Sequence, residues 1–200
     1  MNLRLKETYN SGTRPEEWPR PLAEEERKAV LSAADAAGRD AFCVVAAMLY
    51  MGLRPNEAAD IPFRRAVGDA IEINGRFLHI PAEYKNAVLR KFEGVPFLLN
   101  QRLTDYRETD AAAAAVAAFD AAGLDTAGAW LRLRRTAAQL HYMYRWTRAE
   151  DIERWFSETR RMNGYLKEVY YNPEAMRAYD SGTIDADGVL NIEAPDMGVF

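Results

Sequence analysis

Apolar residues recur at helical spacing through most of the chain, and this pattern predicts a mainly α-helical protein. A first helix is expected from Leu22 onward, where three successive glutamates suit the positive start of a helix. A second, Asp40 to Tyr50, is apolar nearly all round, so we expect it to be buried. Gly52 ends it, and Pro55 suits the first turn of a short third helix carrying Asn56 to Ile61.

The only clear β signal lies in the middle of the chain. Ala70 to Ile73 and Arg76 to Ile80 alternate in hydrophobicity, and Asn74-Gly75 between them is the strongest two-residue hairpin turn. Val95 to Leu99 could supply a third strand. The segment Glu83 to Gly94 would then be a largely polar connection. The expected sheet is therefore small, antiparallel and three-stranded.

After this sheet the pattern becomes helical again and then fades. Residues 1–21 hold three prolines and no periodicity, which favours an irregular N-terminal arm. Residues 22–179 are expected to form the folded domain, and 180–200 a flexible acidic tail. The further helices are expected at about Thr109–Ala122, Trp130–Trp146, Glu150–Phe156 and Met162–Tyr171.

Length and composition describe an ordinary globular chain. Two hundred residues suit one domain with a sizeable core. The longest apolar run, Ala41 to Met51, is too short to span a bilayer, so no membrane partner is expected. The N-terminus lacks the apolar stretch of a secretory signal, and the single cysteine, Cys43, excludes an internal disulfide. These features predict a cytoplasmic protein.

Charge is distributed unevenly along the chain. The net charge is −4, whereas nucleic-acid binders are usually basic. However, phosphate contacts need only a local basic surface. The tail from Asp180 onward is acidic, without Lys or Arg. Residues 131–161 are instead rich in arginine, namely Arg132, Arg134, Arg135, Arg145, Arg148, Arg154, Arg160 and Arg161.

Four chemically suited side chains occur in order along the chain. They are Arg54 at a helix–helix junction, Lys85 after the hairpin, Arg134 near a helix start, and a tyrosine near the end. Two arginine forks can clamp the nonbridging oxygens of a phosphodiester. A tyrosine hydroxyl can then attack the phosphorus, and a lysine can protonate the leaving sugar oxygen. The set favours phosphoryl transfer.

The segments around these residues resemble signature motifs of the tyrosine recombinases, also called the phage integrase family. Gly52 to Glu57 resembles the first box, Gly-Leu-Arg, two variable residues, then Glu. Tyr84-Lys85-Asn86 leading to Val95-Pro96-Phe97 resembles the β-turn lysine and the strand after it. Leu131 to Thr136 resembles the second box, His-x-Leu-Arg-His-Thr. The resemblance covers roughly residues 22–179.

The resemblance implies the recombinase catalytic-domain fold and site-specific DNA recombination, of the integrase or resolvase type. A tyrosine attacks the scissile phosphate, leaves a 3′-phosphotyrosyl link, and the reverse step joins a new strand. Neither a metal nor a nucleotide cofactor is needed. The resemblance assigns catalysis to Arg54, Lys85, Arg134 and a tyrosine, and DNA contacts to Arg132 and Arg135.

The resemblance also implies partners. Members act on double-stranded DNA and assemble as homo-oligomers by passing a C-terminal helix to a neighbour, which the segment after Pro173 could do here. Such enzymes occur in mobile elements and viruses. Residues 1–21 are too short for the separate N-terminal DNA-binding domain that members usually carry.

Two catalytic assignments have rivals within the chain. Tyr165 follows Arg134 by 31 residues, the usual spacing of the nucleophile, and is preferred. Tyr170, in a Leu-x-x-Val-Tyr context, is the alternative. Lys91 is similarly a rival to Lys85 within the same polar segment.

The chain also departs from the family pattern. Leu131 replaces the first histidine of the second box, and Arg135 its last. Nine residues before the nucleophile, members usually carry another histidine. Counted from Tyr165 this position is Phe156, which can only buttress the site, and counted from Tyr170 it is Arg161, which could add charge stabilisation. These departures motivate an alternative, a recombinase-like protein that binds DNA or regulates a partner without cutting. A helical protein unrelated to DNA is a third hypothesis. His141 lies on an apolar stripe and is expected to be a hydrogen-bonded core histidine.

Overall fold

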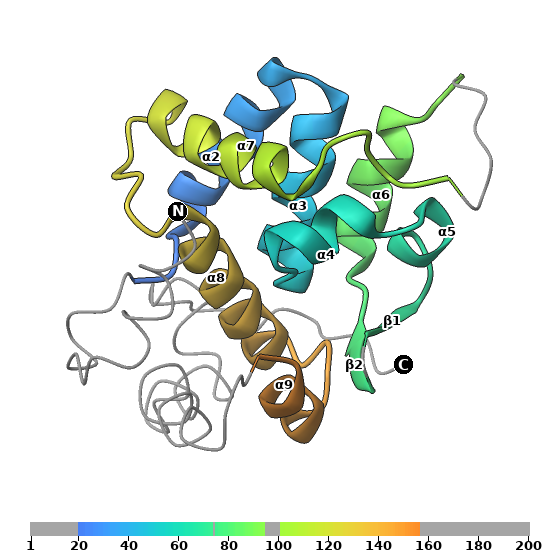
Figure 1. The fold of residues 1–200 in the computed structure, drawn as a ribbon. Helices are drawn as coiled ribbons and strands as arrows, with labels where there is room; N and C mark the ends of the chain where they lie inside the picture. Colours follow the sequence, from blue (N-terminus) through green and yellow to red (C-terminus); the bar gives the residue numbers. More distant parts are fainter. Residues whose placement is uncertain (1–19, 74, 95–100, 157–200) are drawn as a thin grey trace.

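The computed structural model describes residues 20–73, 75–94 and 101–156, which form a helical body with one small hairpin (Figure 1). The broad class predicted from the sequence, mainly α with a small antiparallel sheet, is confirmed. The elements are α2 (Glu24–Ala37), α3 (Arg39–Met51), α4 (Pro55–Asp60), α5 (Phe63–Ala66), β1 (Ala70–Ile73), β2 (Arg76–His79), α6 (Ala82–Lys91), α7 (Glu108–Ala121), α8 (Ala129–Met143) and α9 (Ala149–Phe156).

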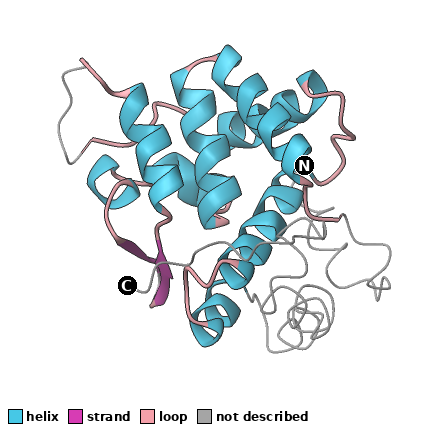
Figure 2. Cartoon of the chain, turned by 180° about the vertical axis from the view of Figure 1, so that it is seen from behind, coloured by secondary structure: helices cyan, strands magenta, loops and turns pink. Residues whose placement is uncertain are grey.

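Helix α3 is the centre of the fold. Every residue from Ala41 to Met51 is buried, as expected for a helix that is apolar nearly all round. It contacts α2, α4, α6, α7 and α8, which belong to the helical body that Figure 2 shows from behind. Because it is buried among these helices from Ala41 to Met51, α3 is a rigid support for the turn that follows it.

The hairpin forms as the alternation predicts. Strands β1 and β2 pair antiparallel, with Ala70 opposite His79 and Ile71 opposite Leu78. Ile71 and Leu78 are buried and their neighbours more exposed, so one face packs on the body. The sheet described has two strands. The third strand predicted at 95–99 lies outside the described residues.

The segment after the hairpin differs from its prediction. Glu83 to Gly94 is not a polar connection, because most of it belongs to helix α6. Tyr84 and Val88, one helical turn apart, are fully buried and attach the helix to the core. The other positions mix charged residues with alanine, asparagine and leucine, so this two-residue apolar stripe gives little periodicity in the sequence. Lys85 therefore lies on a helix and not in a loop beside a turn.

The boundaries of helices α7, α8 and α9 agree with the predicted ones to within three residues. The long helices predicted from Thr109 and Trp130 are α7 and α8, and α9 matches the shorter one before Phe156. Helix α8 ends at Met143, earlier than predicted, because the backbone takes a positive φ at Arg145. No helix in the described part of the chain is long and apolar enough to cross a membrane. The predicted helix 162–171 and tail 180–200 lie outside the described residues, as do residues 1–19 of the arm.

Candidate functional site at the end of helix α3

The first signature segment forms a tight turn between α3 and α4. Gly52 ends α3 in the left-handed conformation, with φ 61° and ψ 29°. Arg54 is extended at φ −72° and ψ 158°, and Pro55 begins α4 with its fixed φ. Arg54 is partly exposed, unlike the fully buried Leu53 beside it. The turn therefore presents the Arg54 side chain at the edge of the core.

Side chains from α8 and α9 satisfy the last three carbonyl groups before this turn, those of residues 50–52. The final carbonyls of a helix have no partner within the helix. Here His141 Nε2 lies 2.7 Å from Tyr50 O, Trp155 Nε1 donates to Met51 O at 2.7 Å, and Arg134 Nη1 donates to Gly52 O. The end of α3 is thus held from outside, and the position of Arg54 is held with it.

Arg134 is buried and makes two contacts with the backbone. Besides Gly52 O, its guanidinium donates to Trp155 O at 3.0 Å. Its Cζ lies 5.2 Å from the centre of the Phe156 ring, a cation–π distance. The second signature segment therefore contacts the first directly, through Arg134 and the Gly52 carbonyl.

Arg76 joins this cluster, and sequence reasoning missed it. Its Nη1 donates to Trp155 O at 3.1 Å, the carbonyl that Arg134 also uses, and its Cζ lies 5.2 Å from the Trp155 ring centre. It follows the Asn74-Gly75 turn directly. Arg76, on β2, is thus a basic residue beside the hairpin turn that reaches the cluster, whereas Lys85 lies on α6. The place of Arg76 beside the strongest turn signal was the clue available in the sequence.

Glu57 links Arg54 and Arg76. Its Oε2 accepts the backbone N–H of Arg54 at 2.9 Å, and its Oε1 forms an ion pair with Arg76. A glutamate three residues into a helix suits this reach back to the first free N–H, which explains the Arg-x-x-Glu spacing. The Glu57 side chain is 9% exposed, so the ion pair is shielded from water. We call Arg54, Glu57, Arg76 and Arg134 the arginine cluster.

The two predicted lysines lie elsewhere, on α6. Lys85 Nζ is 2.8 Å from Asp69 Oδ1, just before β1. Lys91 pairs with Asp35 on α2 and lies 4.9 Å above the Phe42 ring. Neither of these contacts involves the arginine cluster.

Arg132 and Arg134 face opposite sides of α8, because residues two apart are about 200° apart around a helix. Arg132 is buried, with Nε 3.1 Å from Arg20 O and Nη2 3.3 Å from Glu26 Oε2, and it lies over the Phe119 ring. Arg135 is also buried. The DNA contacts predicted for Arg132 and Arg135 stay predictions, and for Arg132 such a contact requires that it leave Glu26.

The departures from the family pattern have structural counterparts. Leu131 is buried, in the place of a polar histidine. Phe156 packs on Gly52 so closely that a Cβ on Gly52 would collide with its ring. This is the buttressing role expected for an aromatic residue there. The candidate nucleophiles Tyr165 and Tyr170 lie outside the described residues.

His141 is a core histidine, as predicted. It is fully buried, and burial lowers its pKa to about 4 despite the Tyr50 carbonyl. The neutral ring donates from Nε2 to that carbonyl. Nδ1 lies 3.0 Å from Thr147 Oγ1, which also accepts the backbone N–H of His79 at 3.1 Å. The ring thus joins α3, β2 and the α8–α9 turn without carrying charge.

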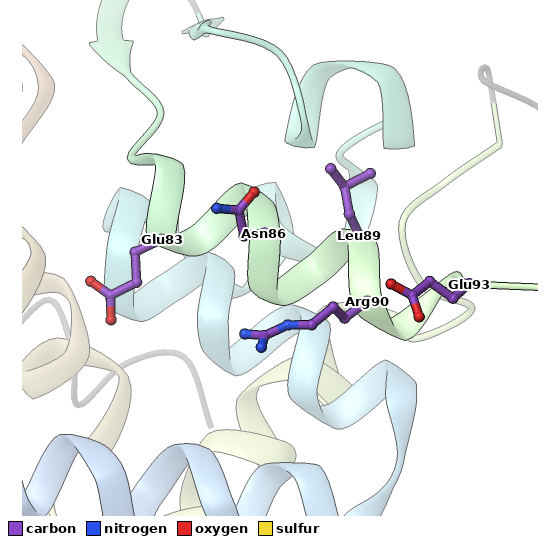
Figure 3. Close-up of a pocket in the computed structure, with 5 residues that line it drawn as sticks. All are labelled: Glu83, Asn86, Leu89, Arg90 and Glu93. Carbon is purple, nitrogen blue, oxygen red and sulfur yellow. The ribbon is translucent and has the colours of Figure 1, made fainter.

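A hollow along α6 is a second candidate for a site. Figure 3 shows its five lining residues, all from α6 and the turn after it. It is open to solvent and brings no groups together from different elements. The arginine cluster, which brings together side chains from α4 and its N-cap, β2 and α8, is therefore the candidate functional site.

Comparison with known proteins gave no relative: no protein-family model, curated protein or solved structure matches this chain.

Proposed function

We propose that the protein is a DNA strand transferase that works as tyrosine recombinases do. The observation that carries the proposal is the contact between the two signature segments, Arg134 Nη1 to Gly52 O. These segments are 82 residues apart in the chain. A coincidental match of two short motifs would not require them to meet. Arg76 on the same carbonyl as Arg134 adds a third guanidinium to the cluster.

The cluster suits a phosphodiester. Three guanidinium groups and one carboxylate leave an excess of positive charge, and phosphate accepts forked arginine hydrogen bonds more strongly than a carbonyl does. Arg54 and Arg134 would bind the nonbridging oxygens. Arg76 would stabilise charge without giving up its proton, because a guanidinium does not deprotonate in proteins.

The proton for the leaving oxygen is assigned to Lys85, as the resemblance implies. Its partner Asp69 is 95% exposed, and such a solvated ion pair is weak enough to exchange for another partner. Lys85 can therefore leave Asp69 when DNA binds. Lys91, which pairs with Asp35, remains the rival donor.

Tyr165 is the proposed nucleophile and Tyr170 its alternative. The phenolic oxygen bonds to the phosphorus as the bond to the 5′ oxygen breaks, and the 5′ oxygen takes a proton. The reverse step transfers the phosphoryl group to a new 5′-hydroxyl. Double-stranded DNA is the proposed partner, and homo-oligomers would assemble on it through the C-terminal segment. The cytoplasm is the proposed compartment.

A second candidate function is DNA binding without cutting, in a regulatory role. Two observations favour it. Arg134 donates to two backbone carbonyls that a phosphate would have to replace, and the buried Leu131 has no proton to exchange.

A nicked suicide substrate separates the two functions. A nick near the scissile phosphate lets the cut fragment diffuse away, so an active enzyme stays covalently attached to DNA and migrates more slowly in a denaturing gel. We expect an adduct that Tyr165→Phe abolishes and Tyr170→Phe leaves intact. Arg54→Ala should abolish it too, whereas Arg65→Ala, which removes an exposed arginine of α5, should retain it.

Each other result selects a different conclusion. An adduct lost only in Tyr170→Phe moves the nucleophile to Tyr170. If the wild type shifts DNA in a native gel but forms no adduct, the enzymatic proposal fails and the non-cutting one remains. If the wild type does not bind DNA even at low salt concentration, both proposed functions fail.

A further inference from the structure

The turn after α8 holds a residue in an unusual backbone conformation. Arg145 has φ 53°, and it is the only non-glycine with a positive φ in ranges 20–73, 75–94 and 101–156. L-residues with a side chain adopt this region at a cost, because Cβ approaches the neighbouring carbonyl. The glycines there with positive φ are Gly38, Gly52, Gly75, Gly94, Gly123 and Gly128.

Other helix ends in the same chain are built differently. Helices α3 and α7 are followed by a left-handed Gly52 and Gly123, the usual solution at a helix C-terminus. Helix α8 is followed by Tyr144 and then Arg145. Glycine would make this turn without strain, so an arginine here is the exception among the positive-φ positions described.

The turn around Arg145 is held firmly on both sides. The rings of Tyr144 and Trp146 are stacked, with centroids 5.1 Å apart and planes 18° apart. Trp146 also meets the His141 ring edge-on at 5.3 Å. His141 is itself fixed between Tyr50 O and Thr147 Oγ1. Arg145 is exposed, so its cation lies at the surface on a rigid support.

Helix α8 connects this turn to the arginine cluster (Figure 1). Arg145 lies 11 residues after Arg134, roughly 16 Å along the helix axis. This is about half of one turn of a DNA duplex, so one bound duplex could reach both places. Arg148, three residues further along, has a side chain 82% exposed, and its pairing with Asp151 leaves it on the same surface loop.

We infer that Arg145 contacts a backbone phosphate of bound DNA, outside the arginine cluster. This inference rests on the proposed function, since it takes DNA as the partner. A phosphate contact needs a fixed cation but no base recognition, which suits a single exposed arginine on a stiff turn. The competing role is structural, because a cation near a helix C-terminus also stabilises the helix dipole.

Arg145→Gly separates the two roles, because it should raise the thermal stability of the protein and lower its affinity for DNA. Glycine relieves the strained backbone, so the melting temperature should rise by about 2–4 °C. Removing one phosphate contact should weaken binding to a short mixed-sequence duplex about eightfold at roughly 0.1 M salt. It should also lower the slope of log Kd against log salt by about one.

Two companion variants complete the design. Arg145→Lys keeps the charge and should bind DNA nearly as the wild type does. Arg107→Ala removes an exposed arginine just before α7 and should change neither binding nor the salt slope.

The outcomes distinguish a failure of this inference from a failure of the proposed function on which it rests. If the wild type fails to bind the duplex, the proposed function and the inference fall together. If the wild type binds and Arg145→Gly binds equally well with the same salt slope, only the inference is overturned. A lower melting temperature for Arg145→Gly also overturns it, because the arginine then serves the helix end. Binding by Arg145→Lys as weak as that of Arg145→Gly excludes a charge contact.

Discussion

Arg134 on α8 donates a hydrogen bond to the carbonyl oxygen of Gly52, the residue that ends α3. One side chain thereby connects the two sequence segments that carry the resemblance to tyrosine recombinases. The same guanidinium reaches Trp155 O on α9, so three elements meet at a single buried charge. Stability and the proposed phosphate binding would therefore depend on the same group.

Arg134→Ala should lower the free energy of unfolding by roughly 3 kcal/mol, because it leaves the Gly52 carbonyl without its Arg134 donor and removes one of the two donors of the Trp155 carbonyl. Arg134→Lys should lose less, since one ammonium can still reach one of them. Urea denaturation followed by circular dichroism measures both. Arg65→Ala, an exposed arginine, should stay within about 0.5 kcal/mol of the wild type. Equal stability of all three variants would show that the Arg134 contacts carry no stability.

Gly52→Ala should destabilise the protein by about 2–4 kcal/mol, from the left-handed backbone at φ 61° together with a collision with the Phe156 ring. Gly123→Ala is the matched control. Its φ is 69°, but a Cβ there meets nothing within 4 Å, so it should cost only about 1 kcal/mol. Thermal unfolding compares the two directly.

A double-mutant cycle tests the collision itself. Phe156→Leu together with Gly52→Ala should lose less stability than the sum of the two single changes. Simple additivity would leave backbone strain as the whole explanation for Gly52.

The protein should lose stability as the pH falls from about 6.5 to about 4. The pKa of His141 is about 4 in the folded protein, so between these values the unfolded chain binds a proton that the folded chain does not. The loss from this group approaches roughly 3 kcal/mol at the lower end of the window. Urea midpoints measured across the window follow it.

Two histidine variants identify the group responsible for that pH dependence. His141→Gln should remove most of this slope, whereas His79→Gln, which changes an exposed histidine, should keep it. An unchanged slope in His141→Gln would mean that another group governs the pH dependence.

Cys43 should react with a thiol reagent only when the protein opens. It is fully buried, and burial, followed by the charge of Asp40, raises the pKa of its thiol to about 12. The reactive thiolate is correspondingly rare at pH 8. We expect native protein to react with Ellman's reagent at least about 100-fold more slowly than urea-unfolded protein. Comparable rates in the two states would contradict the burial of this residue.

The sequence predicted the long helices well and the site only in part. Helix α3 was predictable because its apolar positions cover every face, and the hairpin because Asn74-Gly75 separates two alternating runs. Helix α6 was missed because only Tyr84 and Val88 anchor it. Its short stripe lies among charged residues, where periodicity is weakest.

Arg76 and Trp155 show what local patterns leave out. They are 79 residues apart, and their contact depends on how β2 lies against α9, which no local pattern encodes. By contrast, the opposite directions of Arg132 and Arg134 follow from helix geometry alone. A rotation of about 100° per residue places side chains two positions apart on different faces of any α-helix.

The C-terminal end of α3 is capped by side chains that are synthesised much later than the helix itself. Carbonyls 50–52 belong to the first half of the chain, but their partners are Arg134, His141 and Trp155. A ribosome delivers those partners only after some 80 to 100 further residues. A chain released before Arg134 could form α3 and the hairpin, yet it would lack the groups that fix Arg54. The arginine cluster is thus a late product of synthesis, and premature termination would produce fragments without it.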